Sequence, residues 1–285
     1  MEHTVDFEVL MACMHQENFD IAYQSGVDSD LLIINQCDRE DYQEITVNGY
    51  CWRMISTTER GISKSRNMAL KNARGKIALW ADDDECLTEG YRELVLNAFA
   101  SLPDASMIAF NVERLHLPTK SQYYEIKKIK RSNGARGYGT PMTAFKTEDI
   151  LRSSIRFDER IGSGSEWGGG EESLFQREML KHSLKIYEYP ATVCTINYSS
   201  GSQWFHGYDE KFFYNSGVFS AIIERKFLIR WLRLLYISFI RFRNDKELSP
   251  FQKIQWFCLG EKGWKKNVTY QQFVENGCQF ESKQK

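Results

Sequence analysis

The stretch Ile77-Ala78-Leu79-Trp80-Ala81-Asp82-Asp83-Asp84-Glu85 decides the fold, because an apolar run is followed at once by four acids. Adjacent carboxylates repel one another, so holding them at the end of a strand requires compensating positive charge. A divalent cation such as Mg²⁺, which takes carboxylate and phosphate oxygens, is the simplest source. The pattern indicates a nucleotide held through its diphosphate, and a solvated acidic turn is the alternative.

Other apolar runs on both sides of this stretch predict more strands of the same sheet. Continuous runs of this kind are typical of parallel strands that are covered on both faces. The expected strands are 9–14, 30–35 and 106–110, with a hairpin over 45–52 that turns at Asn48-Gly49, and the expected helices are 62–73 and 89–100. Strands that alternate with helices form an open α/β sheet, in which ligands bind at the carboxyl ends of the strands.

Composition excludes several classes of protein. Of the 285 residues 42% are hydrophobic and 14% are aromatic, which is enough for a large core. Lys and Arg number 37 against 38 Asp and Glu, so we expect no nucleic-acid partner, since such binders carry a basic excess. The seven cysteines include no Cys-x-x-Cys pair, and the first residues do not resemble a secretory signal. These features favour a cytoplasmic protein with reduced thiols.

A glycine-rich segment precedes a second group of acids. Gly168-Gly169-Gly170 is followed by Glu171-Glu172 and then by a helix that we expect over 173–182. Glycines in a row suggest a close approach of the backbone to a ligand. Acids also suit the positive end of a helix, so a purely structural cap is the alternative.

The C-terminal part changes character at Phe227–Arg243, which is apolar with interspersed arginines and contains no acid. It is too charged to span a bilayer. It suits a membrane interface, where Trp, Tyr and Arg lie at the headgroup boundary. The alternative is a helix that packs on the main domain or on a second subunit of a homodimer.

Taken together, the pieces VLMACM, LLIINQCD, ERGISKSRN, IALWADDDE, GGGEESLF and SQWFHGYDEKFF resemble the family 2 glycosyltransferases of the GT-A fold. The resemblance covers about residues 9–217 and is strongest to bacterial enzymes that build capsule, exopolysaccharide or O-antigen units. It implies an open mixed, mainly parallel sheet flanked by helices, with a C-terminal helical extension. We expect residues 1–217 to form the GT-A domain and residues 218–285 a helical region associated with a membrane or a dimer.

The resemblance implies an inverting glycosyltransferase of the hexosyltransferase type. It would transfer a sugar from a nucleotide-sugar, with UDP as the expected nucleotide, to a hydroxyl of a glycan or lipid-linked saccharide. Cell-surface polysaccharide synthesis would be its setting, in the cytoplasm or peripherally on the inner face of the membrane. Mn²⁺ or Mg²⁺ would be its cofactor.

The family pattern also assigns roles to positions of this chain. The ADDDE stretch looks like the DxD motif, and Asp84 is the first choice for the metal ligand. The expected metal ligands are Asp84, Asp82 and His206, and the expected donor-binding residues are Ala12, Asn35, Gln36, Asp38, Arg66, Asn67, Asp82 and Asp83. Asn35-Gln36 replaces the usual pair of aspartates at this position, which weakens the expectation of base recognition.

Where the family has Gly-Glu-Asp, this chain has Gly170-Glu171-Glu172. Glu172 is therefore the expected general base that deprotonates the acceptor hydroxyl, and Glu171 is its rival. Trp167, Gly169, Gly170 and Trp204 are expected on the acceptor side.

Two other functions stay open at this point. A nucleotidyltransferase also combines an α/β sheet with metal-bound acids, but it usually has a glycine-rich loop after its first strand, and the first glycine here is Gly26. A non-catalytic protein that binds nucleotide-sugars with a degenerate site is the second alternative.

Overall fold

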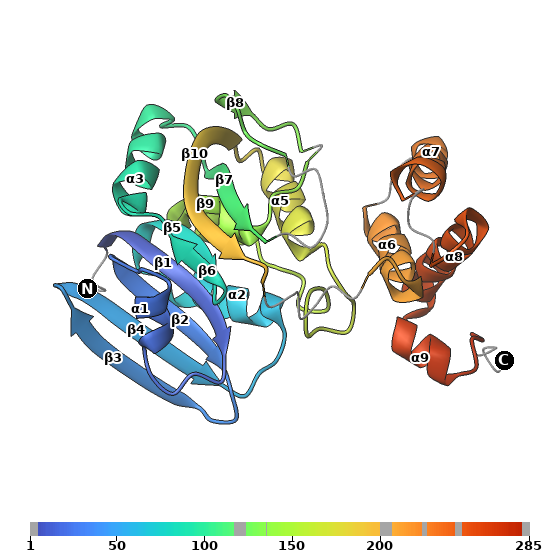
Figure 1. The fold of residues 1–285 in the computed structure, drawn as a ribbon, viewed down its shortest axis with the longest axis horizontal. Coiled ribbons are helices and arrows are strands. Elements are labelled where there is room, and N and C mark those ends of the chain that lie inside the picture. Colours follow the sequence, from blue (N-terminus) through green and yellow to red (C-terminus); the bar gives the residue numbers. More distant parts are fainter. Residues whose placement is uncertain are drawn as a thin grey trace. The chain divides into compact units, whose positions relative to one another are not determined.

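The computed structural model describes residues 5–116, 124–134, 136–199, 207–223, 227–242 and 247–280 (Figure 1). The chain divides into two compact units. Unit 1 comprises Met1–Glu159 and Glu171–Gly201, and unit 2 comprises Arg160–Gly170 and Ser202–Lys285.

Unit 1 is built on one mixed, mainly parallel sheet. Within the described ranges its strand order is β3-β4-β2-β1-β5-β9-β7-β10-β6, and β8 pairs with β10. The strands are β1 (Val5–Met14), β2 (Asp30–Gln36), β3 (Asp41–Val47), β4 (Tyr50–Thr57), β5 (Gly75–Asp82), β6 (Glu85–Leu87), β7 (Met107–Leu115), β8 (Lys130–Arg131), β9 (Thr143–Lys146) and β10 (Ile186–Asn197). Strands β4, β2, β1 and β5 are parallel neighbours, whereas β9 runs antiparallel between β5 and β7.

The expected strands and hairpin are confirmed. Leu31 to Ile34 of β2 are all 0% exposed, as a parallel strand covered on both faces requires. The hairpin between β3 and β4 turns at Asn48 and Gly49, whose φ angles of 51° and 87° suit a two-residue turn that matches strand twist.

Helices and turns complete unit 1. They are α1 (Asp20–Gln24), α2 (Ile62–Asn72), α3 (Tyr91–Ser101), the 3₁₀ turn η1 (Thr140–Met142), α4 (Thr147–Arg152) and α5 (Glu171–Lys181). Helix α2 packs on β1 and β2, α3 on β10, and α4 on β5. Helix α5 begins two residues before the expected start at residue 173, so Glu171 and Glu172 both lie in its first turn.

From residue 207 on, the described part of unit 2 is helical. It contains α6 (Glu210–Ile222), α7 (Phe227–Tyr236), the π-helical turn η2 (Ile237–Arg241), α8 (Pro250–Lys266) and α9 (Tyr270–Glu275). Helices α6 and α8 touch closely at glycines. A Cβ on Gly217 would lie 1.9 Å from the carbonyl oxygen of Phe257, and one on Gly260 would lie 1.9 Å from that of Tyr214.

The boundary expected between residues 217 and 218 falls inside α6, at the glycine that contacts α8. We therefore propose that the C-terminal helical region includes the whole of α6. Gly75 begins β5, where a Cβ would lie 2.6 Å from Cβ of Glu8.

No helix within the described ranges is long and apolar enough to cross a membrane.

Candidate functional site

The carboxyl ends of three neighbouring parallel strands bring the predicted donor-side residues to one edge of the sheet. Ala12 of β1 lies opposite Ile34 of β2 on one side and Asp82 of β5 on the other. Asn35 and Gln36 follow Ile34 directly. This is the edge at which open α/β sheets bind their ligands.

The acidic cluster Asp82–Glu85 connects β5 to β6 at this edge. Asp83 and Asp84 are exposed, whereas Glu85 is buried and its Oε1 accepts a hydrogen bond of 3.0 Å from the amide of Asp82. Burial, together with neighbouring carboxylates, raises the pKa of Glu85 well above its usual value and that of Asp82 to about 6, although Arg66 opposes the shift at Asp82. Burial and Asp84 likewise raise the pKa of Asp83. The cluster thus concentrates negative charge that its surroundings only partly neutralise.

Arg66 links this cluster to the second group of acids. Its guanidinium lies 3.1 Å from Oε1 of Glu171, 3.5 Å from Oε1 of Glu172 and 3.8 Å from Oδ1 of Asp82. The side chain is only 5% exposed. One cation from α2 therefore joins the end of β5 to the first turn of α5.

Two further groups hold the Arg66 side chain in place. Its Nη2 donates a hydrogen bond of 2.6 Å to Oγ1 of Thr140, and its guanidinium carbon lies 5.5 Å from the ring centre of Phe157. Phe157 stacks in turn on Phe175 of α5, with ring centres 4.2 Å apart. These contacts fix the direction in which Arg66 presents its charge.

Glu171 and Glu172 differ in access to solvent. The Glu171 side chain is 7% exposed and that of Glu172 is 25% exposed. Burial and the charge of Glu172 raise the pKa of Glu171 to about 7, although Arg66 opposes the shift. Glu171 is therefore a buried partner of Arg66, and Glu172 is the more accessible carboxylate.

The raised pKa of Glu171 predicts how the stability of the protein depends on pH. A carboxyl with a higher pKa in the folded than in the unfolded state binds more protons when folded, so stability falls as pH rises from about 4.5 to about 7. Glu171→Gln should remove this contribution and flatten the fall. Urea unfolding at several pH values between 4.5 and 8 measures both slopes, and identical slopes in the two proteins would contradict the assignment.

Asn35 and Gln36 are occupied by the protein backbone. The Asn35 amide accepts from the amide of Gln16 at 2.9 Å and donates to its carbonyl at 2.8 Å, and Gln36 makes the same double contact with Gly61 at 3.1 Å. An aspartate could only accept, so it could not make either pair of bonds. The amides hold the loop after β1 and the start of α2.

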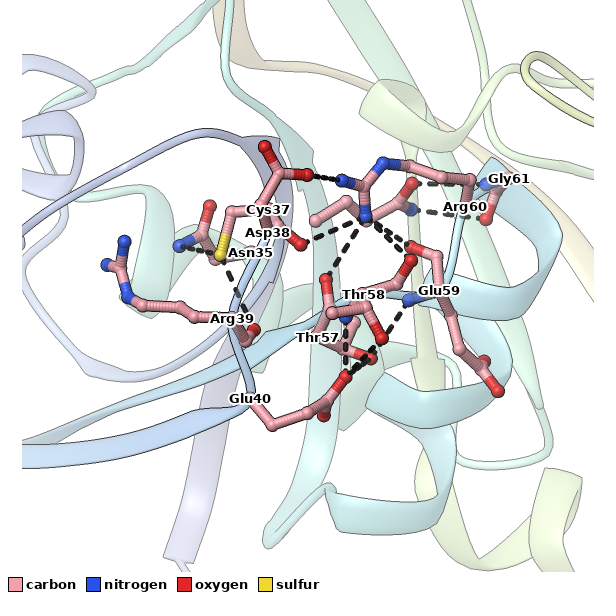
Figure 2. A network of polar contacts seen from close by, with 11 residues as sticks. Asn35, Cys37, Asp38, Arg39, Glu40, Thr57, Thr58, Glu59, Arg60 and Gly61 are labelled. Atoms are coloured by element: carbon pink, nitrogen blue, oxygen red, sulfur yellow. Dashed lines mark hydrogen bonds and ion pairs between the residues drawn. The ribbon is translucent and has the colours of Figure 1, made fainter.

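Next to these amides, Arg60 organises the loops after β2 and β4 (Figure 2). Its Nη2 bonds Oδ1 of Asp38 at 2.6 Å, and its Nη1 donates to the carbonyl oxygens of Cys37, Thr57, Thr58 and Glu59. The Asp38 side chain is 88% exposed, so it remains accessible to a ligand.

Asn67 also contacts backbone inside unit 1. Its amide donates to the carbonyl of Phe157 at 3.0 Å and accepts from the same residue's amide at 2.9 Å. It therefore positions the aromatic ring that lies beside Arg66.

The predicted acceptor-side residues lie in unit 2. Gly168 and Gly170 permit close packing on α6, because Cβ atoms there would lie 2.7 Å from Asn215 and from Phe219. Gly169 has a φ of 69° and no such neighbour within 4 Å, so of the three it alone faces open space. Trp167 is buried with its ring 5.3 Å from that of Trp264. Trp204 and His206 lie outside the described residues.

This glycine loop lines a cavity of about 1000 Å³ within unit 2. The other lining residues combine aromatic with polar side chains and include Phe212, Asn215, Phe219, Tyr270, Gln271 and Gln272. Aromatic faces beside amide and hydroxyl groups are suited to a ligand that is partly apolar and partly polar.

Sequence reasoning missed two members of the Arg66 environment, which are Thr140 and Phe157. Thr140 and Phe157 carry no motif and are far from Arg66 in sequence, so only the folded chain brings them together. Glu85 was singled out as one of the four acids, but its burial was not predicted, although the alternating pattern places Glu85 and Leu87 on one face of β6.

Comparisons with known proteins agree with this architecture. The model of the family "Glycosyl transferase family 2" matches residues 17–154. A crystal structure of S. aureus TarS 1-349 in complex with UDP-GlcNAc is similar over 93% of each chain, with 13% identity and a TM-score of 0.59. A second structure, of S. aureus TarS, is similar over 86% of this chain and 44% of that one, with 14% identity and a TM-score of 0.53. A search of curated proteins found no match.

At these identities the likeness to TarS shows a shared fold, whereas the family match covers the strands and helices that carry Asp82–Glu85 and Arg66. Residues 17–154 thus match glycosyl transferase family 2, and the chain is a glycosyltransferase of the GT-A fold.

Proposed function

We propose that this enzyme is an inverting glycosyltransferase that transfers a sugar from a UDP-sugar to a hydroxyl of a glycan or lipid-linked saccharide. The observation that carries the proposal is the contact of Arg66 with Asp82, Glu171 and Glu172, which unites the two acidic motifs in one site. The UDP-GlcNAc complex of TarS supports UDP as the nucleotide.

The residues present fit a divalent cation that is shared with the donor. Asp82 and Asp84 offer hard carboxylate oxygens, and burial together with mutual repulsion raises the pKa of Asp82. Within the described ranges no three His, Cys, Asp or Glu side chains form a ready metal site. Mg²⁺ commonly binds through one or two carboxylates together with substrate phosphates. Asp84 and Asp82 would hold the cation, which when bound supplies positive charge against the leaving diphosphate.

The chain's own residues would do the rest of the work. Glu172 accepts the proton of the acceptor hydroxyl, since it is the more exposed of the two glutamates. Attack on the face of the anomeric carbon opposite the diphosphate inverts its configuration. Arg66 acts as a positioning residue that orients both Glu172 and Asp82, while Glu171 completes its ion pair.

For the donor, the residues with free access are Asp38 and Asp83, because Asn35, Gln36 and Asn67 already bind backbone. We propose that these three amides shape the loops around the nucleotide. Ala12 contributes backbone at the sheet edge.

Within unit 2, we propose that the cavity in which Gly169 and Gly170 meet aromatic and amide side chains binds a saccharide. Aromatic rings pack against the apolar faces of sugar rings, and amides bond their hydroxyls. A lipid-linked acceptor would place the enzyme peripherally on the inner face of the membrane.

Binding of UDP tests the donor assignment. Asp84→Ala should lose the part of UDP affinity that depends on Mn²⁺, because one of the two carboxylates that would hold the cation is gone. Titration of UDP by calorimetry, with Mn²⁺ and with a chelator, measures that part.

The matched control is Glu89→Ala, which removes another exposed acid a few residues away. It should bind UDP as the wild type does. Equal Mn²⁺-dependent affinity in wild type and Asp84→Ala would overturn the assignment of Asp84.

A further inference from the structure

Helix α7 and the turn η2 are apolar on two sides. Leu234 and Ile237 are buried, and Ile237 packs with Phe213 and Phe242 in the core of unit 2. The exposed apolar side chains are Leu228, Ile229, Leu232, Leu235, Tyr236, Phe239 and Ile240. Leu228 is 68% exposed and Leu232 is 59% exposed. An amphipathic helix needs only one apolar stripe to pack on its own protein, so the second stripe is unexplained by the fold.

The exposed residues form one continuous stripe. Leu228, Leu232 and Leu235 are spaced by four and three residues, which places them on one side of a helix. Phe251 of α8 extends the stripe, since it is 76% exposed and its ring lies 6.0 Å from that of Phe239. We call these eight side chains, from Leu228 to Ile240 with Phe251, the apolar face.

The charged residues of the segment that carries most of the apolar face are arginines. From residue 227 to residue 243 the sequence holds arginines and no acid. Arg230 pairs with Glu261 of α8 at 3.3 Å, and Arg241 is exposed with its guanidinium 5.5 Å from the ring of Phe242. An apolar stripe bordered by arginine complements a surface that is apolar below and anionic at its rim.

We propose that the apolar face lies in the plane of an anionic phospholipid surface. A second copy of the chain fits less well, because a two-fold interface would bring two apolar faces that both carry arginines together. Spanning the bilayer is not required, since helices of this kind bury their apolar side only to the level of the headgroups and acyl boundary. The membrane contact itself does not depend on the proposed function. Only its benefit rests on that function, because the contact would hold the enzyme where lipid-linked acceptors lie.

Co-sedimentation of the full chain with vesicles, without donor, metal or acceptor, tests the proposal independently of catalysis. We expect binding to vesicles of equal parts phosphatidylglycerol and phosphatidylcholine, and weaker binding to phosphatidylcholine alone or at high salt. Leu232→Asp should lower the partition coefficient by at least about tenfold, because it loses the burial of a leucine and adds a repelled charge.

The matched control is Leu151→Asp, which changes an exposed leucine of α4 in unit 1 and should leave vesicle binding unchanged. Circular dichroism of both variants verifies the fold, and Leu228→Asp is the second variant if Leu232→Asp unfolds. Absence of binding to anionic vesicles, or equal loss in Leu232→Asp and Leu151→Asp, would overturn the proposal. A concentration-dependent dimer that Leu232→Asp abolishes, with no vesicle binding, would assign the apolar face to a second copy.

Discussion

Glu172→Gln should lower the rate of sugar transfer by about 10²–10⁴-fold, the usual cost of removing a general base. The change keeps the size of the side chain and removes its ability to accept a proton. UDP binding should survive, because Asp82 and Asp84 are untouched. A transfer assay run beside a UDP titration separates the two effects.

Glu171→Gln is the matched comparison for this prediction. Glu171 is buried against Arg66, so its loss should act through the position of Arg66 and reduce transfer less than Glu172→Gln does. Near-normal transfer by Glu172→Gln, together with an inactive but folded Glu171→Gln, would assign the base to Glu171.

Arg66→Met should destabilise the protein by about 3–5 kcal/mol, because it leaves buried carboxylates without their cation. Thr140 would also lose the donor of its hydrogen bond, while methionine retains part of the packing on Phe157. The loss should be smaller at pH 5 than at pH 8, since carboxyls without a cation bind protons more readily as pH falls. Urea unfolding of wild type and Arg66→Met at both pH values measures this loss of stability.

Arg152→Met is the control, because Arg152 forms an exposed ion pair with Glu148 one turn away on α4. Such pairs contribute about 0.3–0.5 kcal/mol. If Arg66→Met were equally destabilising at pH 5 and pH 8, Arg66 would stabilise unit 1 by packing on Phe157 and not by its charge.

The sheet was predictable because its strands carry local signals. Apolar runs such as Leu31–Ile34 can be satisfied only in a covered parallel strand, and Asn48-Gly49 favours one kind of turn. Strand β10 gave no comparable signal, because Tyr, Glu and Pro interrupt its apolar residues. Its pairing with β7 also shifts register twice.

The motifs in the sequence single out residues of the candidate site, but they do not indicate which of these residues contact one another. The acidic stretch 82–85 and the pair Glu171-Glu172 stand out in the sequence, but nothing in it indicates that Arg66 joins them. At Gly168 and Gly170 the sequence suggested a ligand close to the backbone. In the structure, the side chains of Asn215 and Phe219 on α6 occupy the space that a Cβ on these glycines would need.

Release of UDP from UDP-sugars tests the central claim most directly. With Mn²⁺ present, the wild-type enzyme should release free UDP from at least one member of a panel of UDP-sugars, even with water as the acceptor. Release should fall to background when Mn²⁺ is chelated and in Asp84→Ala, while Glu89→Ala should match the wild type. Tight Mn²⁺-dependent UDP binding without release from any UDP-sugar, in the presence of candidate saccharide acceptors, would contradict the account and indicate a protein that only binds.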